Sequence, residues 1–127
     1  MISLETAKKL KDAGLKWDPN WGDYFAGSEE VEIAKSGSND GQGFYKINYF
    51  GGYMQGNGIV WIPRLDQLLA EISKTEWKWV LFSTGGIFLE NDEKGTWHEI
   101  ECENNEANVE AAAQALLWIL EQEGEKA

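Results

Sequence analysis

His98 and Cys102 are the only histidine and the only cysteine of the chain, and this pair of residue types can form a nucleophile and its general base. They lie four residues apart in a segment whose alternation is typical of a strand, which separates them by about 13 Å. A hydrogen-bonded dyad requires about 3 Å between the two groups. We therefore expect no dyad, and we expect both side chains to face inward together with Ile100.

The opposite side of this predicted strand carries Glu99, Glu101 and Glu103. Carboxylates are the ligands that Ca²⁺ and Mg²⁺ prefer, but neighbours on one strand face are about 7 Å apart, too far for three of them to hold one ion. A single His and a single Cys provide no zinc spacing. We expect no metal and no cofactor, and we regard the three glutamates as candidate binding residues.

Residues 90–106 concentrate the negative charge of the chain, because seven carboxylates and one lysine give −6 of the total −11. Such a patch can imitate a phosphate backbone and occupy the cleft of a nucleic-acid-binding protein. A plain solubility surface is the alternative. The carboxylates are Glu90, Asp92, Glu93, Glu99, Glu101, Glu103 and Glu106.

A second candidate binding segment is the aromatic stretch 17–25, which includes Trp17, Trp21 and Tyr24. Turn residues at 18–20 and 22–23 indicate a loop. The rings either cover the core as a lid or face a ligand.

Arg64, the sole arginine, is the third candidate; it either pairs with Asp66 or anchors an anionic ligand. The glycine-rich stretch 51–57 has the spacing of a phosphate loop but carries Asn57 where that loop needs lysine. We interpret its glycines as hairpin residues.

A central amphipathic helix organises the rest of the chain. Pro63 suits its first turn, and the apolar residues after it recur at the spacing of one buried helix face: Leu65, Leu68, Leu69 and Ile72. Ser3 is the expected N-cap of a first helix that ends near Gly14. A third helix, with Asn108 as its cap, is expected near the C-terminus.

Strand patterns occupy the stretches between the helices. We expect strands at 31–35 and 44–50, a polar loop at 36–43, a meander leading into 59–61, and three further strands between 77 and 103. The predicted order is α-β-β-β-α-β-β-β-α. This order indicates an α+β fold, with three helices packed on an antiparallel sheet of about five to six strands as a two-layer sandwich.

Length and composition limit the possible classes. A chain of 127 residues with 43% hydrophobic residues is expected to form a single domain, residues 1–127. A net charge of −11 with one arginine argues against direct nucleic-acid binding and favours a basic partner. A lone cysteine fits a reducing compartment, and we find no signal peptide and no apolar run of membrane-spanning length. We expect a cytoplasmic protein.

Three segments resemble a group of small uncharacterised phage and prophage proteins of Gram-positive bacteria: Leu10–Trp17 followed by Pro19 and Gly22-Asp23, Trp61–Leu69, and Ala115–Leu120. The resemblance does not include residues 36–58. It implies a phage or prophage origin and the cytoplasm of the host cell as location, and it carries no activity.

Two functional classes follow. We expect a non-enzymatic accessory or anti-defence protein that binds a host protein with the acidic patch or the aromatic segment, because no catalytic constellation emerges. The alternative is a small-molecule or nucleotide-binding module, or a minor enzyme, with a pocket near residues 17–25 and Arg64. A structural assembly component is a more distant third possibility.

Overall fold

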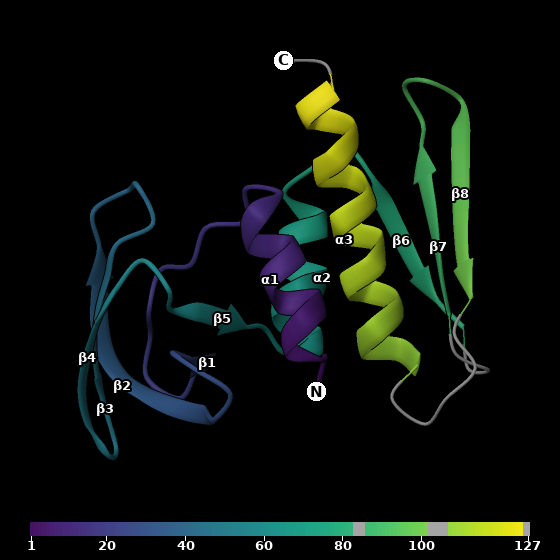
Figure 1. Ribbon diagram of the computed structural model, residues 1–127. Helices are drawn as coiled ribbons and strands as arrows, with labels where there is room; N and C mark the ends of the chain where they lie inside the picture. Colours follow the sequence, from purple (N-terminus) through teal and green to yellow (C-terminus); the bar gives the residue numbers. More distant parts are fainter. Residues whose placement is uncertain (83–85, 102–106, 126–127) are drawn as a thin grey trace. The chain divides into compact units, whose positions relative to one another are not determined.

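The computed structural model describes residues 1–82, 86–101 and 107–125, and contains three helices and eight strands (Figure 1). Contacts between residues divide the chain into two compact units. We call Ser3–Pro63 the N-terminal unit, and Met1–Ile2 together with Arg64–Ala127 the C-terminal unit. The α+β class and the predicted order of helices are confirmed, whereas the strands form two antiparallel sheets of five and three strands.

The N-terminal unit contains one helix and the five-stranded sheet, whose strand order is β4-β3-β2-β1-β5. Every strand pair in it is antiparallel. The elements are α1 (Leu4–Asp12), β1 (Tyr24–Ala26), β2 (Val31–Asn39), β3 (Tyr45–Tyr49), β4 (Gly52–Gly56) and β5 (Val60–Ile62).

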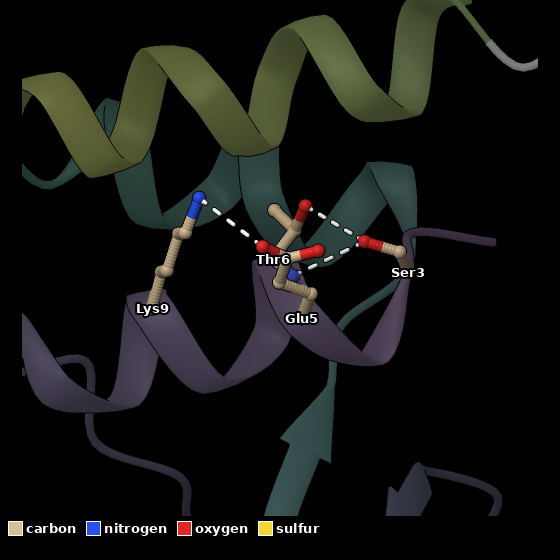
Figure 2. A network of polar contacts seen from close by, with 4 residues as sticks. All are labelled: Ser3, Glu5, Thr6 and Lys9. Atoms are coloured by element: carbon tan, nitrogen blue, oxygen red, sulfur yellow. Dashed lines mark hydrogen bonds and ion pairs between the residues drawn. The ribbon is translucent and has the colours of Figure 1, made fainter.

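Helix α1 begins and ends as the sequence predicts. The Ser3 hydroxyl accepts a hydrogen bond from the Thr6 amide at 3.1 Å, which caps the helix, and donates one to the Thr6 hydroxyl at 2.9 Å (Figure 2). Glu5 and Lys9 form an exposed ion pair of 3.7 Å one turn apart. Gly14 follows the helix with a φ of 106°, a conformation that favours glycine.

Three sequence predictions for the sheet are wrong. Strand β2 continues to Asn39 instead of ending at Lys35, because its polar residues pair with β3 beyond a bulge between Ala34 and Ser36. Strand β5 does not continue the meander after β4, because it pairs with β1 at the opposite edge of the sheet. Tyr24 and Phe25, predicted as the end of a loop, belong to β1, the strand between β2 and β5.

The core of the N-terminal unit is aromatic. Trp17 lies at its centre, with its ring 5.7 Å from Phe25, 5.4 Å from Tyr45 and 6.4 Å from Trp61. Ala34, Ile47 and Ile59 complete the buried cluster. Burial of these large side chains provides much of the driving force for folding of this unit.

The C-terminal unit is a two-layer structure, in which two helices pack on one face of the three-stranded sheet β6-β7-β8 (Figure 1). Helix α2 contacts β6, and α3 contacts β7 and β8. The elements are α2 (Leu65–Ser73), β6 (Lys78–Leu81), β7 (Gly86–Asn91), β8 (Thr96–Glu101) and α3 (Ala107–Glu125).

The two helices start close to the predicted positions. Leu68 and Ile72 of α2 are fully buried, as their spacing predicts, whereas Leu65 and Leu69 are half-buried. The helix has Arg64 as its N-cap, so Pro63 precedes the cap instead of occupying the first turn. The Arg64 amide donates to Oε1 of Gln67 at 2.9 Å, which explains why the helix starts there. Helix α3 starts at Ala107, one residue before the predicted cap Asn108.

Candidate functional site

The outer face of the three-stranded sheet, opposite to α2 and α3, combines aromatic side chains with carboxylates. The antiparallel register places Val80, Phe88 and Glu99 in one cross-strand row. The next row consists of Lys78, Glu90 and Trp97. We call these six residues and Glu101, which shares the face by alternation, the acidic–aromatic face.

Two apolar side chains of this face are strongly exposed. Trp97 exposes 64% of its surface and Val80 exposes 55%. The Trp97 ring stacks on Phe88 with a centroid distance of 5.9 Å and an angle of 24° between the rings. Phe88 itself is half-buried. An exposed tryptophan that stacks on a second ring among charges is typical of the anchor of a protein-binding surface.

Carboxylates surround this pair. Glu90, Glu99 and Glu101 are all exposed. The one lysine of the face, Lys78, forms an ion pair with Asp92, and the hydrogen bond and charge of Asp92 raise the pKa of Lys78 above its usual value. Asp92 thus neutralises the charge of Lys78, and the face carries a net negative charge.

The charge of the chain is distributed unevenly between the two units. The C-terminal unit has 14 Asp and Glu against five Lys and Arg, a net charge of −9. The N-terminal unit has eight against six, a net charge of −2. The acidic–aromatic face therefore lies in the unit that carries most of the negative charge.

The inner face of the same sheet holds His98 as a packing residue. Its ring stacks on Trp118 of α3 with a centroid distance of 4.2 Å and an angle of 5°, and Trp118 meets Trp77 edge-on at 5.0 Å. The predicted inward position of His98 beside Ile100 is confirmed, and a depression of about 280 Å³ adjoins them. Cys102 lies outside the described residues.

The aromatic segment 17–25 divides between core and surface. Trp17 is 1% exposed, and its indole N–H donates to Oδ2 of the buried Asp23 at 2.9 Å. Trp21 is 68% exposed, and Tyr24 is half-buried in β1. The segment is therefore a core lid at Trp17 and a surface feature at Trp21.

Arg64 forms the expected ion pair, with its Nε 3.4 Å from Oδ1 of Asp66. It belongs to the C-terminal unit, whereas Trp17, Trp21 and Tyr24 belong to the N-terminal unit. Of the predicted acidic residues, Glu99 and Glu101 are exposed on the acidic–aromatic face, and Glu103 lies outside the described residues.

The glycine-rich stretch 51–57 is a hairpin strand, as we interpreted it. Gly52–Gly56 form β4, paired with β3 from Tyr45 to Tyr49. Another depression in the N-terminal unit, of about 330 Å³, adjoins Tyr45 and is lined by Lys11, Lys16 and Gln42 among others. The ammonium of Lys11 is already engaged there, since it donates to the carbonyl oxygens of Asn57 and Ile59.

Sequence reasoning identified the glutamates of the acidic–aromatic face but not its apolar part. Trp97 alternates with Glu99 and Glu101 and must share their strand face, so the signal was available in the sequence. Val80 and Phe88 join this face through the register of β6 and β7, which the sequence does not specify.

Comparison of the chain with protein-family models, with curated proteins and with solved structures found no match. Among the described residues, no helix is both long and apolar enough to cross a membrane. The same residues contain no group of three or more His, Cys, Asp or Glu side chains that could hold a metal ion.

Proposed function

We propose that the chain is a non-enzymatic accessory protein of a phage or prophage that binds a basic host protein through its acidic–aromatic face. The observation that carries this proposal is the exposed Trp97, stacked on the half-buried Phe88 among Glu90, Glu99 and Glu101. The phage or prophage origin rests on the sequence resemblance described above, and it implies action in the host cytoplasm.

The two kinds of side chain on this face serve different steps of binding. Carboxylates attract a basic partner and increase the rate of encounter. Burial of Trp97 and Val80 against the partner then slows dissociation, because aromatic anchors contribute a large share of interface free energy. A face with both properties favours a protein partner that carries lysine or arginine around an apolar patch.

Nucleic-acid mimicry is a specific form of this proposal. Glu99 and Glu101 protrude from one strand face about 7 Å apart, and the C-terminal unit has a net charge of −9. An acidic surface of this kind can occupy the basic cleft of a host enzyme that acts on nucleic acid. This role would make the protein an inhibitor of host defence.

The alternative of a small-molecule pocket near residues 17–25 and Arg64 has less support. Trp17 and Asp23 are bonded to each other in the core, and Arg64 is paired with Asp66. These contacts leave Trp21 as the most exposed ring of the aromatic segment.

The test is affinity capture of the tagged protein from a Gram-positive host lysate at low and at high salt. The proposal predicts one host protein of basic isoelectric point at near-equal stoichiometry, with recovery that decreases as salt increases. Trp97→Ala should abolish capture, whereas Tyr53→Ala, a matched change of an exposed aromatic in the N-terminal unit, should not. Capture that the Trp97 variant retains would show that another surface binds the partner.

A further inference from the structure

The N-terminal unit has a second exposed face, which is polar and, unlike the acidic–aromatic face, carries no carboxylate. The register of β2, β3 and β4 places Ser36, Asn48 and Tyr53 in one cross-strand row. Ser38, Lys46 and Gln55 form the next row. All six side chains are exposed, and we call the two rows the polar platform.

An aromatic pair adjoins the polar platform at the Phe50 end of β3. Trp21 and Phe50 meet edge-on at 5.1 Å and expose 68% and 57% of their surfaces. Phe50 is held against β2 because its amide donates to the carbonyl oxygen of Ile33 at 3.3 Å. The ammonium of Lys35 lies 4.8 Å from the centre of the Phe50 ring.

Hydrogen bonds within the platform orient its amides. Asn48 donates from Nδ2 to the Ser36 hydroxyl at 3.3 Å, and the Tyr53 hydroxyl donates to Oε1 of Gln55 at 3.1 Å. Within the described chain, these bonds leave the amide oxygen of Asn48 and the amide nitrogen of Gln55 without a protein partner. The platform therefore offers an oriented acceptor at Asn48 and oriented N–H donors at Gln55 to a ligand.

The charge of the polar platform differs from that of the chain as a whole. The platform and its aromatic pair include one cation, Lys46, and no carboxylate, and the adjoining Lys35 is a second cation, although the chain has a net charge of −11. A ligand that fits must supply hydroxyl groups for the amides and an apolar surface for the rings, and needs no strong charge.

From these contacts we propose that the polar platform, with Trp21 and Phe50, binds an oligosaccharide. A sugar ring presents hydroxyl groups at its rim and C–H groups on its faces. The hydroxyl groups match the serine, asparagine and glutamine side chains, and the C–H face matches the electron-rich face of an aromatic ring. This site is independent of the proposed host-protein interface.

The size of the platform suits a short oligosaccharide. The distance from Lys46 to Phe50 along β3 is about 13 Å, and three adjacent strands span about 10 Å across. A single-stranded nucleic acid also stacks on aromatic rings, but two lysines on a chain of charge −11 provide little attraction for its phosphates.

The test is a titration of the ¹⁵N-labelled full chain, followed by amide chemical shifts. The probes are neutral tetrasaccharides of β-1,4-linked N-acetylglucosamine, β-1,4-linked glucose, α-1,4-linked glucose and mannose. At least one should shift the amides of Ser36, Asn48 and Tyr53 and the indole N–H of Trp21. Trp21→Ala and Tyr53→Ala should each raise the Kd about tenfold or more, and the matched control Trp97→Ala should leave it unchanged.

Three results would overturn the oligosaccharide site. One is the absence of shifts with every tetrasaccharide while the spectrum shows a folded chain. Another is a response to an oligouridylate, lost in high salt, without a response to sugars, which would assign the face to RNA. The third is concentration-dependent dimerisation that Phe50→Ala abolishes, which would show that a second copy of the chain covers the platform.

Discussion

The indole nitrogen of Trp17 donates a hydrogen bond of 2.9 Å to Oδ2 of Asp23, and both side chains are almost completely buried. The same carboxylate oxygen accepts from the backbone amide of Asn20 at 3.1 Å. Asp23 therefore ties the turn at 18–23 to the aromatic core, and it satisfies the one polar group of the central tryptophan.

Removal of this carboxylate is expected to destabilise the protein. Asp23→Ala leaves the buried Trp17 donor without an acceptor and removes the bond to the Asn20 amide, so we expect the free energy of unfolding to fall by about 2 to 3 kcal/mol. Urea denaturation followed by far-ultraviolet circular dichroism measures this loss. Asp23→Asn keeps an oxygen in place and should cost less, whereas the exposed Glu30→Ala should cost about 0.5 kcal/mol or less. Equal losses for Asp23→Ala and Glu30→Ala would contradict the assigned role of the buried carboxylate.

The cap of α1 provides a second prediction. Ser3→Ala removes the hydroxyl that accepts from the Thr6 amide (Figure 2), and it should lower the free energy of unfolding by about 1 kcal/mol. The neighbouring Glu5→Gln breaks only an exposed ion pair with Lys9 and should cost about 0.5 kcal/mol or less. Thermal unfolding of the two variants should separate the cap from the ion pair, and an equal shift in Tm would count against the cap.

Lys11 gives the stability a defined dependence on pH. Burial lowers the pKa of its ammonium below the usual lysine value of 10.5, and the charge of Asp12 opposes this shift in part. Between the lowered pKa and 10.5 the folded chain binds fewer protons at Lys11 than the unfolded chain, so this residue makes stability rise with pH.

The corresponding measurement compares denaturant unfolding at neutral pH and at about pH 10. Lys11→Met should remove the contribution of Lys11 to the rise of stability with pH. The change in the free energy of unfolding from neutral pH to about pH 10 should therefore be less positive than in the wild type. Lys9→Met, a change at an exposed lysine of the same helix, should leave the wild-type pH dependence in place. If both variants behave alike, burial of Lys11 is not the cause.

Local features of the fold could be predicted from the sequence because they depend on neighbours along the chain. The Ser3 cap, the Gly14 helix end and the buried spacing of Leu68 and Ile72 are of this kind. The pairing of β5 with β1 was missed because Phe25 and Trp61, which lie opposite each other, are far apart in sequence. The residues of a short strand and its neighbours do not predict which edge of a sheet the strand will join.

The candidate site shows the same division. Alternation predicts that Glu99 and Glu101 share a face, and extending it by one step would have added Trp97. Burial of Trp17 beside exposure of Trp21 could not be predicted, because both are tryptophans in one turn-rich segment. Only the position of Tyr45, Phe25 and Trp61 around Trp17 distinguishes them.

The acidic–aromatic face leads to a prediction that separates its two kinds of contact. Trp97→Ala should lower the free energy of unfolding by about 0.5 to 1.5 kcal/mol, through the loss of its stack on Phe88. Glu99 and Glu101 are exposed, so the double change Glu99→Gln with Glu101→Gln should alter it by about 0.5 kcal/mol or less. Both variants should nevertheless bind the captured partner more weakly than the wild type.

Salt then distinguishes the two variants. The Kd of the glutamine double variant should approach that of the wild type as ionic strength rises, because salt screens the charges that the double variant lacks. The Trp97→Ala variant should remain weaker at every ionic strength, because burial of an indole does not depend on screened charge. Surface plasmon resonance against the captured protein provides both curves. If the glutamine variant kept the full salt dependence of the wild type, the partner would bind to carboxylates elsewhere in the C-terminal unit. The assignment of the acidic–aromatic face to binding would then be wrong.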